Sequence, residues 1–176
     1  MILPIILYRN IVLRNKASEV TFGSDITSIV SNMFETVNKA LGCGLAAPQV
    51  GKSEKFFIVN YADENDEVYE KVFINPKIVV NEGKIVSYTE GCLSLPNVEV
   101  TVDRIEDVTI TYFDINWQTH TERYQGFMAR IIQHEYDHLL GKLIIDYVKD
   151  DEKKAVAKAL SKIDEKNIHI NYPVCV

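Results

Sequence analysis

Residues 133–138 read Gln-His-Glu-Tyr-Asp-His and place two histidines, His134 and His138, four positions apart. Residues at this spacing lie on one face of an α-helix, so both imidazoles can reach a single metal ion. Glu135 lies beside them and is a candidate proton acceptor for a water at that metal. Apolar residues at helical spacing flank the motif: Phe127, Ile131, Ile132, Leu139 and Leu140. The sequence therefore predicts a metal-binding helix that ends near Gly141.

Two histidines leave such a site incomplete, because a catalytic zinc-type centre usually has three protein ligands and a water. Glu152 and Glu165 are candidate third ligands downstream, but both lie in charged runs typical of solvent-exposed helix faces. We prefer Cys92, in the upstream segment Glu-Gly-Cys-Leu-Ser, although an isolated cysteine is more commonly a buried structural thiol. A thiolate with two imidazoles is a suitable ligand set for Zn²⁺ or Fe²⁺.

A third segment, residues 42–49, reads Gly-Cys-Gly-Leu-Ala-Ala-Pro-Gln. Its small residues allow close approach of backbone to a ligand, and Gln49 offers an amide donor for a developing oxyanion. The alternative interpretation is a helix end followed by a tight turn. Alone, this segment is weak evidence of a site.

Composition limits the classes of protein to which the chain can belong. A length of 176 residues predicts a single domain over 1–176, and the net charge of -6 argues against direct nucleic-acid readout. The apolar start, residues 1–8, is too short to span a bilayer. Three scattered cysteines do not form a disulfide framework, so we expect a reducing, cytoplasmic setting without membrane association.

The pattern of apolar residues predicts an α+β fold, with antiparallel-rich β-sheets packed around the central metal-binding helix. A helix capped by Ser24 or Asp25 is expected to run to about Ala40, and a last helix is expected to start at Asp150. The tail from 168 onward is expected to be a strand or an ordered coil. Strands are expected at residues 56–60, 72–80, 84–88, 98–102, 107–115, 119–124 and 143–147.

Together, and in this order, the three segments resemble the motifs of the peptide deformylase family. That family carries Gly-x-Gly-Leu-Ala-Ala-x-Gln, Glu-Gly-Cys-Leu-Ser and Gln-His-Glu-x-x-Asp-His, and every fixed position matches here. The resemblance extends from residues 12–14 to residues 143–146. Three ordered motifs are far more specific than His-Glu-x-x-His alone.

The resemblance implies removal of the N-formyl group from N-formylmethionine of newly made polypeptides, with release of formate. It implies one divalent metal held by Cys92, His134 and His138, Fe²⁺ in the cell, with Zn²⁺, Ni²⁺ or Co²⁺ as substitutes. In that family pattern Glu135 takes a proton from the metal-bound water and delivers it to the leaving amine. Gln49 and the backbone N–H of Leu93 match the family's oxyanion donors.

The resemblance also implies that the peptide binds as an added strand, along backbone at Gly44 and at Glu90 and Gly91. An apolar pocket would receive the methionine side chain. Cys43, where the family usually has a branched aliphatic residue, is either a small wall residue of that pocket or an oxidisable thiol near the metal. Some family members dock on the ribosome near the exit tunnel through their C-terminal region, so the resemblance makes the ribosome a candidate partner, which no motif of this sequence identifies.

Several neighbouring residues receive supporting or structural assignments from the sequence. We expect Arg104 to be solvated rather than paired with Glu90, and Phe127 to lie in the core. Asp137 and Gln133 either support the site or lie on the helix surface. His120, His169 and Tyr136 are assigned surface or packing roles.

Two alternatives remain open from the residues alone. The first is another His-Glu-x-x-His metallopeptidase, with Glu152 or Glu165 as third ligand. The second is a non-catalytic metal-binding protein. Glu135, Gln49 and the open fourth metal position argue against the second, because structural zinc sites fill all four positions with protein.

Overall fold

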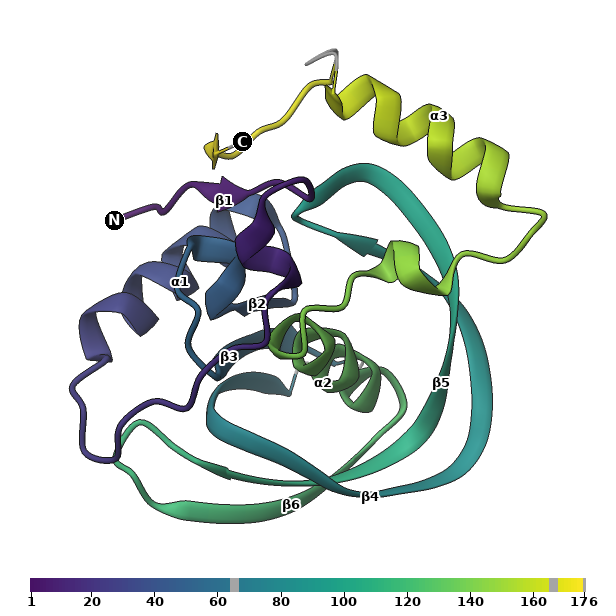
Figure 1. The fold of residues 1–176 in the computed structure, drawn as a ribbon. Coiled ribbons are helices and arrows are strands. Elements are labelled where there is room, and N and C mark those ends of the chain that lie inside the picture. Colours follow the sequence, from purple (N-terminus) through teal and green to yellow (C-terminus); the bar gives the residue numbers. More distant parts are fainter. Residues whose placement is uncertain (64–66, 165–167, 176) are drawn as a thin grey trace.

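The computed structural model describes residues 1–63, 67–164 and 168–175, and these form an α+β fold (Figure 1). An antiparallel sheet of order β2-β3-β4-β5-β6 curves around the central helix α2, and α1 and α3 lie outside it, which confirms the predicted fold class. The elements are β1 (Ile5–Ile6), η1 (Ile11–Arg14), α1 (Thr27–Ala40), β2 (Gly44–Ala46), η2 (Ala47–Val50), β3 (Phe56–Ala62), β4 (Val68–Cys92), β5 (Leu95–Phe113), β6 (Thr119–Gln125), α2 (Gly126–Leu139), η3 (Ile144–Tyr147), α3 (Lys153–Asp164) and β7 (Val174–Cys175).

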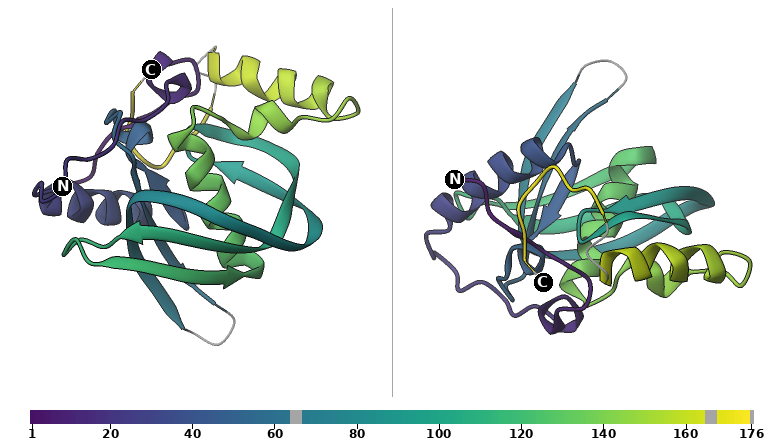
Figure 2. Two further views of the ribbon diagram at one scale, coloured as in Figure 1. Left: turned by 60° about the horizontal axis from the view of Figure 1, so that its bottom comes forward. Right: turned by 90° about the horizontal axis from the view of Figure 1, so that it is seen from above.

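Strands β4 and β5 are much longer than the sequence predicts, because each joins two predicted strands. Their ladder shifts register at several points, including the step between Glu82 and Ile85. Such bulges bend a strand and increase its twist without ending it. Gly83 supplies a positive φ of +93° at one of these points, which a sequence pattern reads as a break. The bent pair wraps around α2, as Figure 1 and the left view of Figure 2 show.

The core lies between α2 and the concave face of the sheet. Met128, Ala129 and Ile132 of α2 pack against Phe57 and Phe73 of the sheet, all of them buried. A second cluster joins the buried face of α1 to β3, as the spacing of its apolar residues predicts. The first cluster also includes Ala46, so it fixes α2 relative to β2, whereas Cys92 at the end of β4 packs in a third cluster with Leu95 and Val98.

Three predicted boundaries are wrong. Helix α1 begins at Thr27 with Ile26 as its N-cap, instead of Ser24 or Asp25. Residues 144–147 form the 3-10 helix η3 instead of a strand, because the Asp146 carboxylate accepts a hydrogen bond from the backbone N–H of Leu143 at 2.9 Å. A local side-chain bond of this kind competes with strand pairing. Helix α3 begins at Lys153 instead of Asp150, after a turn in which Glu152 accepts from the N–H of Lys149.

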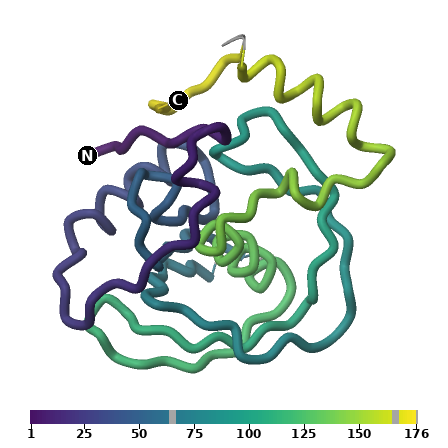
Figure 3. The backbone as a smooth tube through the Cα atoms, in the orientation of Figure 1, coloured from purple at the N-terminus to yellow at the C-terminus, as the bar shows by residue number. Residues whose placement is uncertain are grey.

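The two ends of the described chain lie side by side, which the tube in Figure 3 shows. β1 and β7 pair in parallel, with Ile5 opposite Val174, so part of the C-terminal tail is a strand. Within the described residues, no helix is both long and apolar enough to cross a membrane.

A carboxylate on β6 gives a test of the fold's pH dependence. Glu122 accepts hydrogen bonds from Lys71 at 2.9 Å, from Tyr112 at 2.6 Å and from Tyr124. Burial alone would raise the pKa of Glu122, but these bonds outweigh it and hold the pKa at about 2, against an ordinary 4.5. The ionised carboxylate therefore stabilises the fold above pH 4.5, and its contribution is lost as the pH falls towards 2.

We expect Glu122→Gln to lower the free energy of unfolding at pH 7, with a loss that shrinks between pH 4.5 and pH 2. Urea denaturation at a series of pH values measures this difference. Glu70→Gln, at an exposed position of β4, is the matched control. A loss of equal size at pH 7 and pH 2 would assign the effect to packing instead of charge.

Candidate metal centre and active-site pocket

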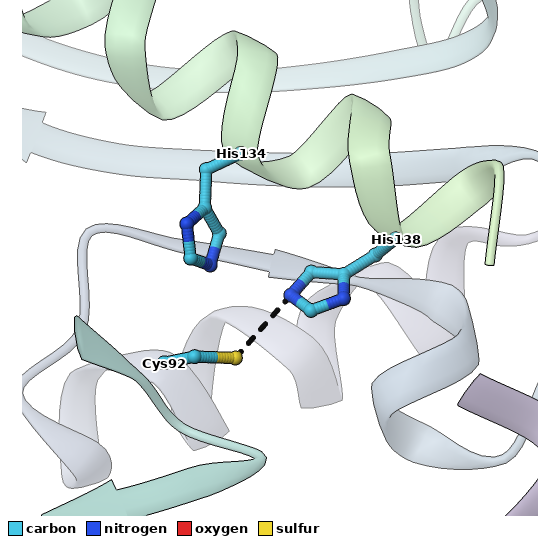
Figure 4. Close-up of side chains that lie close together, drawn as sticks. All are labelled: Cys92, His134 and His138. Carbon is cyan, nitrogen blue, oxygen red and sulfur yellow. Dashed lines mark hydrogen bonds between the residues drawn. The ribbon is translucent and has the colours of Figure 1, made fainter. Parts of the chain in front are cut away.

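Three candidate metal ligands meet between the end of β4 and helix α2. One ligand atom from each of Cys92, His134 and His138 lies within 4.8 Å of the other two. The sulfur of Cys92 is 3.4 Å from Nε2 of His138, and Figure 4 shows both imidazoles on the same side of α2, towards Cys92. The four-residue spacing of the histidines on a helix produces this arrangement. The structure thus brings together the three residues that the sequence predicts as ligands.

The chemistry of these donors fits a divalent metal ion. Nδ1 of His134 is hydrogen-bonded to Oε2 of Glu90 at 2.9 Å, which leaves Nε2 as the nitrogen available to a metal. A carboxylate on the far nitrogen of a histidine is a common support for a metal ligand. Thiolate and imidazole donors together suit Zn²⁺, Fe²⁺ and similar ions.

Glu135 lies next to this group and is 4% exposed. Its Oε2 is buried and has no hydrogen-bond partner among the described residues, as expected for a carboxylate that serves a water or substrate. Burial raises the pKa of Glu135 to about 7, where a carboxylate can both accept and release a proton near neutral pH. Gly44 makes room for it, because a Cβ there would lie 2.5 Å from Oε1 of Glu135.

A buried ion-pair network supports His134. Glu90 accepts hydrogen bonds from Nε of Arg104 at 2.6 Å and from Arg130 at 2.6 Å, and Arg104 also donates to Asp137 at 2.9 Å. Burial alone would raise the pKa of Glu90, but the bonds from His134 and Arg104 lower it to about 2. The expectation of a solvated Arg104 is therefore wrong, because two carboxylates offset the cost of its burial.

Asp137 and Gln133 differ in their relation to this network. Asp137 contacts it, since its carboxylate accepts from Arg104 and also from the Tyr147 hydroxyl at 2.9 Å. Gln133 donates to the backbone carbonyls of Ile105 and Ala129, away from the candidate ligands. The sequence left both assignments open, and the structure connects only Asp137 to the site.

Gln49 and Leu93 lie beside Cys92. The side-chain carbonyl of Gln49 accepts from the N–H of Ala46 at 2.8 Å, so its amide group must face the site. That amide donates to Oγ of Ser94 at 3.3 Å and lies 3.6 Å from the Cys92 sulfur. Leu93 follows Cys92 directly, in the turn between β4 and β5.

A pocket of about 470 Å³ opens over the candidate metal centre. His138 lies outside its lining and is 1% exposed, whereas the other predicted site residues line it. The sequence missed part of the wall: Tyr88, Phe127, Arg130 and the tail residues His169 to Tyr172. Phe127 was expected in the core but is 42% exposed, because the first turn of α2 extends to the pocket mouth. The predicted residues that line the pocket are Cys43, Gly44, Gln49, Glu90, Gly91, Cys92, Leu93, His134 and Glu135.

Cys43 is half-buried in the pocket wall, and burial, together with the Glu135 carboxylate, raises the pKa of its thiol. Because the thiolate is the form that peroxide oxidises, we expect Cys43 to react slowly at neutral pH. Cys43→Ala should then lose activity in hydrogen peroxide at the same rate as the wild type. Markedly slower inactivation of the variant would instead identify Cys43 as the sensitive thiol.

The alternative ligands do not join this group. Glu152 accepts a hydrogen bond from the backbone N–H of Thr101 at 2.9 Å, which places its carboxylate on β5. Glu165 lies outside the described residues. His120 is paired with Asp114 at 2.9 Å in the β5–β6 hairpin. Among the residues that the structure describes, Cys92 is the side chain that completes the histidine pair.

Comparisons with known proteins agree with this geometry. The family model described as polypeptide deformylase matches residues 2–154. A peptide deformylase of Christiangramia forsetii is 40% identical over 185 residues, covering 98% of this chain and 94% of its own. A plant peptide deformylase structure superposes with a TM-score of 0.86 at 36% identity, covering 94% of this chain and 90% of its own.

A Met-Ala-Ser-bound peptide deformylase from Acinetobacter baumannii superposes with a TM-score of 0.76 at 30% identity, covering 84% of this chain and 99% of its own. Sequence and fold thus agree over nearly the whole length of the chain. The chain therefore belongs to the peptide deformylase family and is an enzyme, a metal-dependent hydrolase that removes formyl groups from peptides.

Proposed function

We propose that this enzyme removes the N-formyl group from N-formylmethionine at the start of newly made polypeptides, at the site formed by Cys92, His134, His138 and Glu135. One observation carries the proposal. The three ligand atoms lie within 4.8 Å of one another, and the buried, unpartnered Oε2 of Glu135 lies on the helix that bears both histidines. This combination provides a metal site and a proton acceptor in one pocket.

Cys92, His134 and His138 would hold one divalent metal, which we propose is Fe²⁺ in the cell. Zn²⁺, Ni²⁺ or Co²⁺ can replace it, because a thiolate and two imidazoles accommodate each of these ions. When bound, the metal supplies a Lewis acid that lowers the pKa of a water and polarises the formyl oxygen. Glu90, hydrogen-bonded to Nδ1 of His134, keeps that ring turned towards the metal position.

The protein's own residues then move the proton and stabilise the developing charge. Glu135 takes a proton from the water that attacks the formyl carbon and passes it to the methionine nitrogen as the C–N bond breaks. The products are formate and a free α-amino group. Gln49 Nε2 and the backbone N–H of Leu93 donate to the formyl oxygen as it becomes negative. The backbone N–H of Ala46 donates to the side-chain carbonyl of Gln49, and this bond orients the Gln49 amide group for that role.

The formylated peptide is proposed to bind between β2 and β4, with backbone at Gly44, Glu90 and Gly91 as its hydrogen-bonding edges. Its methionine side chain would lie against the apolar part of the wall, which includes Cys43, Phe127 and Ile131. The Met-Ala-Ser bound by the Acinetobacter baumannii structure is a peptide of the kind that this arrangement would accept. Gly91 leaves open space, since a Cβ at that position would meet nothing within 4 Å.

We also propose a cytoplasmic location and contact with the ribosome, where nascent chains emerge. Lys154, Lys158 and Lys162 are exposed and lie four residues apart, so they form one basic face of α3. Such a face suits RNA phosphates without reading base sequence. Changing all three lysines to Glu should abolish salt-sensitive co-sedimentation with ribosomes and leave hydrolysis of a short formylated peptide unchanged. Unaltered co-sedimentation would remove α3 from the contact.

Formate release from formyl-Met-Ala-Ser tests the function, using anaerobically prepared protein whose metal content has been counted. We expect release that a chelator abolishes and that added Fe²⁺ restores. Cys92→Ser should lose both metal and activity, whereas Cys175→Ser, at an exposed cysteine, should retain both. No release with one metal bound per chain would overturn the assignment. Unformylated peptides would then be tested for cleavage.

A further inference from the structure

The C-terminal tail forms part of the pocket wall, although it lies beyond residues 2–154, where the family model matches. His169, Ile170, Asn171 and Tyr172 all line the pocket. The pairing of β7 with β1 anchors the tail immediately after them. In Figure 1 the tail returns from α3 across the same side of the molecule as β1. The tail is therefore placed to act on the site.

Tyr172 makes the most specific contact of the tail. Its hydroxyl donates a hydrogen bond of 2.8 Å to the backbone carbonyl of Leu93. The ring is half-buried and packs against the cluster between α1 and β3 that also contacts Leu93. The donor is thus held in place by packing as well as by its acceptor.

The carbonyl that Tyr172 holds belongs to the turn that joins β4 to β5. Cys92 is paired with Leu95, so Leu93 and Ser94 are the two central residues of this turn. Two-residue hairpins favour turns of type I′ or II′, which need a positive φ at the first central residue. Neither Leu93 nor Ser94 has a positive φ, so the turn lacks the geometry that matches strand twist.

Contacts from other elements hold this turn instead. Gln49 donates to Oγ of Ser94 at 3.3 Å, and the backbone N–H of Tyr8 donates to the Ser94 carbonyl at 3.0 Å. Tyr172 supplies the contact to Leu93. In turns with negative φ at the first central residue, the peptide unit between the central residues points in opposite directions in types I and II. The negative φ of Ser94 excludes type II, and the hydrogen bond from Tyr172 to the Leu93 carbonyl opposes rotation of this peptide unit.

We propose that Tyr172 is a positioning residue: by holding the Leu93 carbonyl, it fixes the turn that carries the Cys92 sulfur and the Leu93 N–H. This inference rests on the proposed function, which makes Cys92 a metal ligand and Leu93 an oxyanion donor. The Leu93 N–H matters most when negative charge develops on the formyl oxygen. Loss of the Tyr172 hydroxyl should therefore affect kcat and leave KM nearly unchanged.

Tyr172→Phe in the metal-loaded enzyme tests this inference. We expect kcat for formyl-Met-Ala-Ser to fall about 3- to 10-fold, the effect of one neutral hydrogen bond, with KM changed less than about twofold. Metal content and melting temperature should match the wild type. Tyr112→Phe is the matched control, because it removes a hydroxyl that donates to Glu122 at 2.6 Å, outside the pocket lining. Its kcat should equal that of the wild type.

Amide hydrogen exchange of the metal-free protein provides a readout besides activity. Exchange in the fragment covering residues 90–97 should be faster in Tyr172→Phe than in the wild type and in Tyr112→Phe. Unchanged kcat and unchanged exchange would overturn the inference. A lower melting temperature and metal content together with a higher KM would also overturn it, because that combination marks a merely structural residue. A wild type that released no formate would contradict the proposed function, and the exchange rates would still decide the role of Tyr172.

Discussion

Replacing Glu135 with Gln is expected to lower kcat for formate release by about 10²- to 10⁴-fold, the usual contribution of a positioned acid–base group. The amide keeps the size of the side chain but cannot take a proton from the attacking water. Glu135 is not one of the three grouped ligands, so the variant should bind one metal per chain, as the wild type does. Formate assays at saturating substrate, with metal counted on the same sample, measure both quantities.

Glu152→Gln is the matched control for this experiment. Its carboxylate caps backbone N–H groups at Thr101 and Lys149, away from the pocket, so hydrolysis should be unaffected. The same pair of variants separates the alternatives. A peptidase that used Glu152 as a ligand would lose its metal in Glu152→Gln. The function of a non-catalytic metal-binding protein would be unchanged in Glu135→Gln. Either result would replace the mechanism proposed here.

The part of the site that follows local rules could be predicted from the sequence. The spacing of His134 and His138 on a helix places both rings on one face, whatever the rest of the chain does. The fold class followed in the same way from apolar periodicity. Cys92 was harder, because nothing local connects it with α2, and its choice depended on the suitability of a thiolate beside two imidazoles and then on the family resemblance. The structure places its sulfur beside the two histidines.

The residues that the sequence missed depend on contacts between distant segments. Arg104 is fourteen positions from Glu90, and its burial between Glu90 and Asp137 follows from the curvature of β4 and β5. That curvature comes from bulges, which a strand pattern reads as breaks. Tyr172 lies 79 positions from Leu93 and reaches it only because β7 pairs with β1. Neither contact leaves a signal in local composition.

The network around Glu90 gives the second large expected effect. Glu90→Gln would leave Arg104 and Arg130 buried without their shared carboxylate, and His134 without a charged acceptor at Nδ1. Removing one partner of a buried ion pair costs about 3–5 kcal/mol, because the remaining charges lose compensation. Loss of the carboxylate behind a ligating histidine typically weakens metal binding by about 10- to 100-fold. Both losses are therefore expected from a change that alters neither a ligand nor the pocket's shape.

Urea denaturation of the metal-free protein measures the stability loss, and competition with a chelator measures the metal affinity. Glu70→Gln, exposed on the same strand, should change neither quantity. A destabilised variant with wild-type metal affinity would show that His134 is oriented by packing alone. Wild-type stability would mean that Asp137 and backbone carbonyls, such as that of Val102 which Arg130 already contacts at 3.0 Å, are sufficient for the two arginines. The measurement thus separates the structural role of Glu90 from its role at the metal.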